Sequence, residues 1–528
     1  MDSIGPNGGN DKRKRRVLIC GWAPRDLRGW HWPSLAPPVL VSYLKSREDL
    51  AADYEFSFRD FSDDDSSDAI VSSIRESRPW LVGWSTYVWS IERILALSGL
   101  LKAEDPDLKI ILGGPQVSDR EFAEWVIDHH GAVDAVVRGE GEVGLAGLLA
   151  RLLGPRQKWA GPGVSSRNGT GRAVSEPLAP ILRALDLCLL PYLTGVIPLA
   201  HPDGLYLNLQ SSRGCRYGCG YCAWGRTRLR EFPLHLVMAQ LDRVLDARIC
   251  GALFLDADFF ADDQKACAIL EKLVRRAPGG HWQMEADPTH ISDRALDFLA
   301  QLSHTMVGLG LQSVTPEVLR LAGRPAVDLD QFAAATARLK RHAPDLDVSI
   351  EIMCGLPGET PETYRDSLEF ALGLGSGWVS ASCLVPLPGT PFHKRAEHYG
   401  IQHAGPPTFQ LLSTSTFPAE ELRAAVLFTA FIRFCFQRAG LRTMVRNMGL
   451  RRGGHQPIVS IYEELYRAVE ARAGAICSYP ASPLVDLEIF NQMSEQYSGQ
   501  AAVAALQHAL LCQVSQDVLS SGWRPGIN

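Results

Sequence analysis

The sequence has little that would direct it to a membrane or to a nucleic acid. No stretch approaches the roughly 20 consecutive apolar residues of a membrane-spanning helix. The basic N-terminal start lacks the apolar stretch of a signal peptide. The 528-residue chain has a formal net charge of −6, so it has no excess of positive charge for a polyanion. We therefore expect a cytoplasmic protein with no nucleic-acid and no membrane partner.

Paired cysteines are also scarce. Most of the twelve cysteines stand singly among apolar residues, as Cys20, Cys250, Cys354 and Cys383 do. Such a distribution is typical of buried thiols in a reducing compartment and argues against disulfides. The exception is the segment Leu209–Trp224, with the sequence LQSSRGCRYGCGYCAW, which holds three cysteines.

Cys215, Cys219 and Cys222 stand on this one loop with the spacing C-x3-C-x2-C. Thiols so placed indicate a metal site rather than disulfides. Zinc sites usually add a second cysteine pair or histidines, and neither follows here. Ferredoxins use four cysteines for each cluster, whereas three would leave one iron of a four-iron cluster open to another ligand. The alternative, a chance spacing of three buried thiols, explains such a specific pattern poorly.

Upstream of this loop, short apolar runs alternate with stretches of helical spacing such as Ser67–Glu76. The runs predicted as strands are Val17–Cys20, Glu55–Asp60, Trp80–Ser85, Lys109–Leu112 and Ala132–Val137. This alternation predicts a doubly wound parallel sheet with ligands at the carboxyl ends of its strands. Three turns at those ends carry the candidate contacts Ser85, Thr86, Tyr87, Gly113, Gly114, Gly139 and Glu140. Glycine there permits close approach of a ligand, although many such turns carry glycine for structural reasons alone.

The alternation restarts at residue 205 and predicts six further strands in a partial barrel. These strands are Leu205–Leu209, Ala252–Leu255, His281–Glu285, Met306–Leu311, Val348–Cys354 and Trp378–Leu384. Barrels of this kind place their active sites at the carboxyl ends of the strands. Acidic residues gather there, as in Asp256, Asp258, Glu285 and Asp287, although such residues also serve as helix caps.

The cysteine loop, the turns GLPGET (355–360) and PLPGTP (386–391), and the upstream glycine turns together resemble the cobalamin-dependent radical S-adenosylmethionine (SAM) enzymes. The resemblance covers about residues 15–440. It implies a 4Fe–4S cluster on Cys215, Cys219 and Cys222, with SAM on the open iron and an external electron donor of the flavodoxin or ferredoxin type. It also implies that the upstream turns border cobalamin.

The resemblance further assigns residues of the predicted barrel to SAM. The ribose and methionyl contacts would be Glu285, Gln312, Ser313 and Arg324, and the backbone around Val385 would border the adenine. A sulfonium ligand with a carboxylate needs an acidic neighbour near its ammonium group and a cation near its carboxylate. The sequence names no catalytic acid or base.

One departure from related cobalamin proteins is informative. The motif D-x-H-x-x-G, which supplies a histidine beneath the cobalt in mutases and methionine synthase, is absent, and the first loop offers His31 alone. We expect cobalamin to bind without a histidine beneath the metal. A loop at 451–455 with two arginines and a histidine is a candidate for substrate contact, although a solvated basic turn is the better interpretation.

The predicted fold class is therefore α/β, with an N-terminal doubly wound parallel-sheet cobalamin-binding domain, a partial (β/α)6 radical SAM barrel and a helical C-terminal region. The predicted boundaries are a disordered tail at 1–14, the Rossmann-like cobalamin domain at 15–155, a linker at 156–200, the barrel at 201–395 and a helix-rich capping region at 396–528. The linker prediction rests on Lys158–Val174, which is rich in Gly, Pro, Ser and Arg.

The resemblance implies a biosynthetic methyltransferase that moves a methyl group from SAM, by way of methylcobalamin, to an unactivated carbon of a natural product or peptide. A cyclase or rearrangement enzyme without methyl transfer is the first alternative. An inactive cobalamin-binding sensor or scaffold is the second, and the intact cysteine triad argues against it. Methylthiolation is disfavoured, because the first domain lacks the cysteines of a second cluster.

Overall fold

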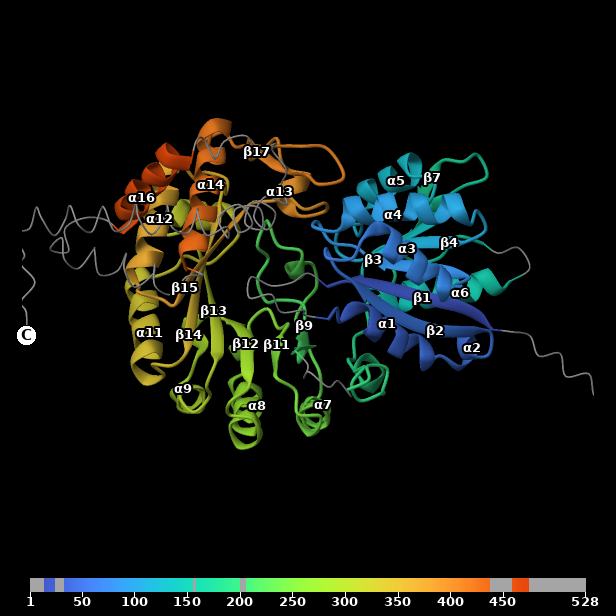
Figure 1. Ribbon diagram of the computed structural model, residues 1–528, viewed down its shortest axis with the longest axis horizontal. Helices are drawn as coiled ribbons and strands as arrows, with labels where there is room; N and C mark the ends of the chain where they lie inside the picture. The colour runs from blue at the N-terminus through green and yellow to red at the C-terminus, as the bar shows by residue number, and fades with distance from the viewer. Residues whose placement is uncertain (1–13, 24–32, 155–157, 200–205, 437–457, 474–528) are drawn as a thin grey trace, which may run out of the picture. The chain divides into compact units, whose positions relative to one another are not determined.

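The computed structural model describes residues 14–23, 33–154, 158–199, 206–436 and 458–473. It divides into two compact units, one of residues 1–209 and 230–250 and the other of residues 210–229 and 251–528. Figure 1 labels their helices and strands. Within the described residues, no helix is both long enough and apolar enough to span a membrane.

The first unit contains a seven-stranded sheet in the order β2-β1-β3-β4-β5-β6-β7. Its strands are β1 (Arg15–Trp22), β2 (Tyr54–Phe61), β3 (Leu81–Ser85), β4 (Lys109–Gly113), β5 (Ala135–Val137), β6 (Val164–Arg167) and β7 (Ala173–Ser175). The first five are parallel, and the last two join antiparallel. The predicted doubly wound sheet is confirmed, with an antiparallel extension that the sequence did not reveal.

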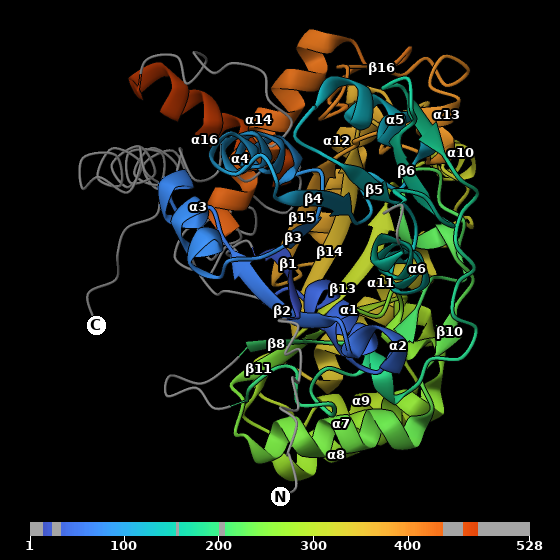
Figure 2. The same ribbon diagram turned by 90° about the vertical axis from the view of Figure 1, so that its right-hand side faces the viewer.

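Helices cover both faces of this sheet. They are α1 (Ala36–Lys45), α2 (Glu48–Ala51), α3 (Ser67–Glu76), α4 (Ile91–Glu104), α5 (Arg120–His129) and α6 (Gly141–Leu153). Helix α7 (Leu234–Asp246), later in the chain, is assigned to the same unit. Figure 2 shows α3 and α4 on one side of the strands and α1, α2 and α6 on the other. Helix α3 begins where the Ser66 hydroxyl accepts a hydrogen bond from the Ala69 N–H at 3.2 Å, and its buried Ile74 follows the buried Ile70 and Val71 by four and three residues.

The segment predicted as a linker is in part a hairpin of the first sheet. Strands β6 and β7 are joined by the turn 168–171, in which Asn168 Oδ1 accepts hydrogen bonds from the N–H groups of Thr170 (2.9 Å) and Arg172 (3.1 Å). An Asn-Gly pair between two short runs is a hairpin signal, which the Gly- and Ser-rich composition obscured. The interpretation of Lys158–Val174 as a linker is therefore wrong.

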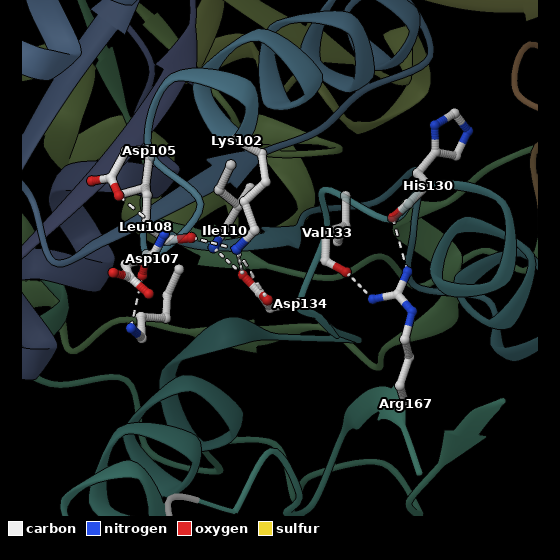
Figure 3. A network of polar contacts seen from close by, with 10 residues as sticks. Lys102, Asp105, Asp107, Leu108, Ile110, His130, Val133, Asp134 and Arg167 are labelled. Atoms are coloured by element: carbon white, nitrogen blue, oxygen red, sulfur yellow. Dashed lines mark hydrogen bonds and ion pairs between the residues drawn. The ribbon is translucent and has the colours of Figure 1, made fainter. Parts of the chain in front are cut away.

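Polar contacts fasten this hairpin and the neighbouring strands to the sheet (Figure 3). Arg167 on β6 donates to the carbonyl oxygens of Val133 (2.6 Å) and His130 (3.0 Å), just before β5. Lys102 on α4 lies 3.0 Å from Asp134, whose carboxylate also accepts from the Ile110 N–H at 2.7 Å. The hairpin is thus held by the same region that links α5 to β5.

The second sheet has six strands in the order β15-β14-β13-β12-β11-β8. They are β8 (Tyr206–Leu209), β11 (Gly251–Phe254), β12 (His281–Ala286), β13 (Thr305–Gln312), β14 (Asp347–Cys354) and β15 (Trp378–Cys383). Every register from β11 to β15 is parallel. The six strands predicted for the partial barrel are all found.

Helices alternate with these strands and continue beyond them. They are α8 (Asp263–Arg276), α9 (Asp293–Leu299), α10 (Pro316–Leu321), α11 (Leu329–His342), α12 (Pro361–Gly373), α13 (Pro391–Lys394), α14 (Ala419–Phe436) and α16 (Ile458–Ala473). Glu369 on α12 accepts hydrogen bonds from the N–H groups of Ile458 (2.7 Å) and Val459 (2.8 Å) at the start of α16. A carboxylate at a helix N-terminus is favourable, and this one fixes the last described helix against α12.

Shorter elements complete the described chain. They are the 3-10 turns η1 (Leu187–Leu189), η2 (Trp224–Arg226), η3 (Phe259–Ala261) and η4 (Pro288–His290), and the short strands β9 (Ser212–Arg213), β10 (Arg230–Glu231), β16 (Gln402–His403) and β17 (Leu411–Ser413). Strands β16 and β17 form an antiparallel pair. The loop that bears the cysteines runs between β9 and η2.

Candidate cofactor sites

The start of the cysteine loop is anchored on a buried carboxyl group. Asp256, which follows β11, accepts hydrogen bonds from the Ser211 N–H (3.1 Å) and hydroxyl (2.7 Å) and from the Ser212 hydroxyl. Burial raises the pKa of Asp256, and the two serine hydroxyls oppose that shift. The predicted position at a strand end is therefore occupied by a residue that holds the loop rather than by a helix cap.

The loop itself is fixed by backbone contacts before the first cysteine and between the second and third. Gly214 has φ +82°, and a Cβ atom there would lie 2.5 Å from the Arg228 carbonyl oxygen. The Gly220 N–H donates to the Ala322 carbonyl at 2.8 Å, and the Phe392 N–H donates to the Gly220 carbonyl at 3.0 Å. These bonds tie the middle of the loop to the end of α10 and to the start of α13.

The three thiols of the loop suit a four-iron cluster with one open iron. In the described part of the chain, no three His, Cys, Asp or Glu side chains lie close enough to hold one metal ion. In a four-iron cluster each cysteine binds a different iron, so its ligands stand farther apart. The thiols of Cys215 and Cys222 accept hydrogen bonds from the N–H groups of Tyr217 and Trp224, both at 3.4 Å. Such donors support the thiolate form that iron requires.

Burial raises the pKa of the Cys215 thiol, and the other two thiols raise it further. Burial likewise raises the pKa of Cys222. Three thiolates on one loop repel one another and need a compensating positive charge, which iron ions provide. The donor set is therefore suited to a cationic metal cluster.

Arg324 connects the loop to the interior of the barrel. Its Nη1 atom lies 3.2 Å from the Tyr221 hydroxyl and 3.7 Å from the Cys219 thiol, and its Nη2 atom donates to the Gly310 carbonyl at 2.9 Å. Its buried Nε atom has no hydrogen-bond partner in the described residues. A buried guanidinium with a free donor fits a carboxylate, as the resemblance predicted for the methionyl end of SAM.

Two carboxyl groups meet beside Arg324. Glu285 on β12 is hydrogen-bonded to Glu351 on β14. On the strand between them, Gly308 pairs with Glu285 and Gly310 pairs with Glu351. A Cβ atom at Gly308 would lie 2.2 Å from Glu285 Oε2, so glycine leaves the space that the carboxyl occupies. Burial and the second carboxyl raise the pKa of Glu285 to about 8, and burial raises that of Glu351.

The other residues assigned to SAM are placed differently from one another. Gln312 has φ +68° at an irregularity in the register of β13 with β14. Ser313 is fully buried, and its hydroxyl accepts from the Thr315 N–H at 3.2 Å, which favours a structural role. Val385 accepts a hydrogen bond from the Leu387 N–H at 2.8 Å within the turn after β15.

In the first unit, the turns after β3 and β4 are joined to each other. The Thr86 hydroxyl donates to the Gly113 carbonyl at 2.7 Å, while Gly114 has φ +98° and would bring a Cβ atom within 2.7 Å of the Thr86 N and O atoms. Ser118, which no sequence motif marks, donates to the Gly114 carbonyl at 2.8 Å and accepts from the Gly139 N–H at 3.2 Å. One hydroxyl thus connects two of the three predicted turns.

The remaining predicted contacts of this unit are Ser85 and Tyr87, in the turn after β3, and Glu140, which forms an ion pair. Ser85 is buried, and Tyr87 stacks on Trp89 with ring centroids 4.7 Å apart. Glu140 is paired with Arg230, whose Nη1 atom lies 3.1 Å from Glu140 Oε2, and both side chains are largely buried. This ion pair favours a structural role for Glu140. His31 and the loop 451–455 lie outside the described residues.

We expect replacement of Gly114 by alanine to destabilise the protein and to weaken cobalamin binding. An alanine in left-handed backbone costs about 1–2 kcal/mol before any clash, and here its Cβ would press on main-chain atoms of Thr86. Thermal unfolding and titration with hydroxocobalamin measure the two effects. Gly131→Ala is the control, since no atom lies within 4 Å of a Cβ there. Wild-type affinity in Gly114→Ala would show that the turn does not border the cofactor.

Two known protein families match different parts of the chain. The B12 binding domain matches residues 42–149, and the Radical SAM superfamily matches residues 209–371. The chain is 29% identical over 417 residues to the cobalamin-dependent radical SAM methyltransferase TokK of Streptomyces tokunonensis, covering 74% of this chain and 58% of the relative. It is 26% identical to the 2-(S-pantetheinyl)-carbapenam-3-carboxylate methyltransferase of Streptantibioticus cattleyicolor, covering 65% and 51%. The chain thus spans between half and three-fifths of these curated relatives.

Solved structures show the same fold. The radical SAM methyltransferase TsrM from Kitasatospora setae, with cobalamin and a [4Fe-4S] cluster bound, has a TM-score of 0.56 at 21% identity, covering 77% of this chain and 81% of TsrM. The cobalamin-dependent SAM radical enzyme OxsB has a TM-score of 0.63 at 14% identity, covering 97% and 82%.

The chain therefore combines a B12-binding domain with a radical SAM domain. These two domains are the pair that the resemblance predicted. The cofactors of this pair of domains are a 4Fe–4S cluster, SAM and cobalamin.

Proposed function

We propose that this protein is a methyltransferase that transfers a methyl group from SAM, through cobalamin, to an unactivated carbon of a small natural product or a peptide. The observation that carries the proposal is the presence, in one chain, of the radical SAM cysteine loop and a B12-binding domain, together with similarity to two curated methyltransferases. TsrM, which shares the fold, has been solved with tryptophan as its substrate. A small organic substrate suits the proposal.

The residues of the barrel would divide the binding of SAM between them. Cys215, Cys219 and Cys222 would hold the cluster, and the free Nε donor of Arg324 would bind the carboxylate of the methionyl group. Glu285 would face the polar atoms of the same ligand. When bound, the cofactors supply an electron for the cleavage of SAM and a carrier for the methyl group. An external flavodoxin- or ferredoxin-type protein would deliver that electron.

In the first unit, the backbone of the turns at 85–87 and 113–114 would border cobalamin. The hydrogen bond between Thr86 and Gly113 and the left-handed Gly114 keep both turns close to the strand ends, where ligands of parallel sheets bind. We propose that no histidine of the protein lies beneath the cobalt. The motif that supplies such a histidine is absent from the whole sequence.

The stoichiometry of SAM consumption tests methyl transfer. We expect two SAM molecules to be consumed for each product, with one S-adenosylhomocysteine from recharging the cobalamin and one 5′-deoxyadenosine from the radical step. With methyl-labelled SAM, mass spectrometry should find the label in the product. Conversion of the substrate with 5′-deoxyadenosine but without S-adenosylhomocysteine or label would replace methyl transfer by cyclisation or rearrangement. Reconstituted protein with no cluster absorbance and no SAM cleavage would support the inactive sensor or scaffold.

A further inference from the structure

Glu285 and Glu351 form a pair that neither the comparisons nor the sequence motifs assign. The two residues sit on β12 and β14, on either side of β13, and their carboxyl groups are hydrogen-bonded to each other. The register places Glu285 opposite Gly308 and Glu351 opposite Gly310. The two glycines of β13 leave room for the carboxyl groups to meet across the middle strand.

Two carboxylates in contact cannot both remain ionised in a poorly solvated site. Placing like charges at hydrogen-bond distance raises the energy of the doubly ionised state, and a shared proton relieves it. The pair is therefore singly charged over a wide pH range. A single negative charge is balanced by the neighbouring guanidinium of Arg324, which attracts the charge of Glu351.

Among the described residues, Arg324 is the charged group that acts on the pKa of the pair besides the two carboxyl groups themselves. Arg324 approaches from the segment after α10, and Tyr221 and Cys219 on the cysteine loop contact Arg324 in turn. Arg324 stays cationic at all relevant pH values. Burial raises the pKa of the Tyr221 hydroxyl, so the tyrosine stays neutral where the carboxyl pair titrates. Burial also raises the pKa of Glu359, in the turn after β14, to about 8, so a variant of Glu351 is needed to assign a change of charge to the pair.

We propose that Glu351 is a positioning residue that shares a proton with Glu285, so that the pair presents one fixed, singly charged acceptor to the ribose or methionyl part of SAM. The inference rests on the proposed SAM site for its ligand. Proton sharing fixes the orientation of Glu285, because its carboxyl group keeps a hydrogen bond to Glu351 whichever of the two residues carries the proton. The loss of the shared proton separates the carboxyl groups and disorders the acceptor.

The affinity for SAM as a function of pH tests the proposal on the cluster-loaded protein. The pKa of Glu285, raised to about 8, places the loss of the shared proton at mildly alkaline pH, so wild-type affinity should fall as the pH rises through that value. In Glu351→Gln the amide donates to an ionised Glu285 without a titratable proton. We expect near-wild-type affinity at neutral pH and no such fall at alkaline pH.

A second variant and an independent spectrum complete the test. Glu351→Ala leaves Glu285 without its partner, and we expect SAM binding about tenfold weaker or worse. Glu317→Gln, in an exposed pair with Arg320, is the control and should follow the wild type. The infrared difference between wild type and Glu351→Gln should contain the carbonyl band of a protonated carboxyl group at neutral pH.

An unchanged alkaline fall in Glu351→Gln, or the absence of that band, overturns the shared proton. Equal loss of affinity in Glu351→Gln and Glu351→Ala would overturn the positioning role. Failure of the proposed function looks different, because SAM would then bind with the expected pH profile while no label reaches a product. The two ideas therefore fail separately.

Discussion

Replacement of Cys215, Cys219 and Cys222 by alanine is expected to abolish iron binding and SAM cleavage together. Three thiols on one loop are the donors that this segment offers for a cluster, and without them the iron ions lose their thiolate ligands. Iron analysis of the reconstituted protein and detection of 5′-deoxyadenosine with a chemical reductant measure the two losses. The expected change is complete loss rather than a graded decrease.

The matched control replaces cysteines that stand away from the loop. Cys188 and Cys250 are partly exposed thiols, and their replacement by alanine should leave iron content and SAM cleavage unchanged. A triple variant that keeps its iron and its turnover would contradict the assignment of the cluster. Loss of iron in the control would instead point to a general defect in folding.

Replacement of Gly214 by alanine is expected to prevent cluster assembly while leaving all three cysteines in place. Gly214 precedes Cys215 in left-handed backbone, and a Cβ atom there would lie 2.5 Å from the Arg228 carbonyl and 2.6 Å from that of Thr227. Both obstacles are main-chain atoms, so no side-chain rotation can relieve them. The Cys215 N–H, which donates to Thr227 at 3.3 Å, would have to move away, and Cys215 with it. Iron analysis and the absorbance of the reconstituted cluster measure this effect.

Gly373→Ala provides the control for this change. Gly373 ends α12 in the same unit, and no atom lies within 4 Å of a Cβ built there. Alanine at such a position is tolerated or slightly stabilising. A Gly214→Ala protein with full iron content would mean that the loop adjusts on binding the cluster, and the backbone of the described loop would then not be the cluster-bound form.

The fold could be predicted to a large extent, because parallel strands carry a strong local signal. Short apolar runs ending in glycine or polar residues located both parallel sheets, and the predicted strands at 80–85, 109–112 and 378–384 lie within two residues of β3, β4 and β15. The hairpin β6–β7 was missed since its strands are short and rich in serine, so that composition outweighed the Asn-Gly turn. Local composition is a poor guide to secondary structure where a long-range contact holds a segment in the sheet, as the hydrogen bond from Arg167 to Val133 does.

The part of the candidate site that is a continuous sequence motif could be predicted. The part that depends on how the strands pair could not. The cysteine loop is continuous in the chain and could be read directly. Glu351 matters because it meets Glu285 across β13, and no local sequence pattern predicts that contact. Asp256 was predicted at the right strand end, but its bonds to Ser211 and Ser212 depend on how the loop folds back. Register and loop path are tertiary properties that a single sequence does not display.

The β6–β7 hairpin also offers a point of attachment for probes. Its tip, residues 168–171, is exposed, and a Cβ atom at Gly169 would meet nothing within 4 Å. Its outer strand β7 has three residues, too few for extended pairing with the edge strand of another molecule. A cysteine introduced at Gly169 could therefore carry a fluorophore or a spin label, which would report on the B12-binding domain without touching the turns proposed to hold its cofactor.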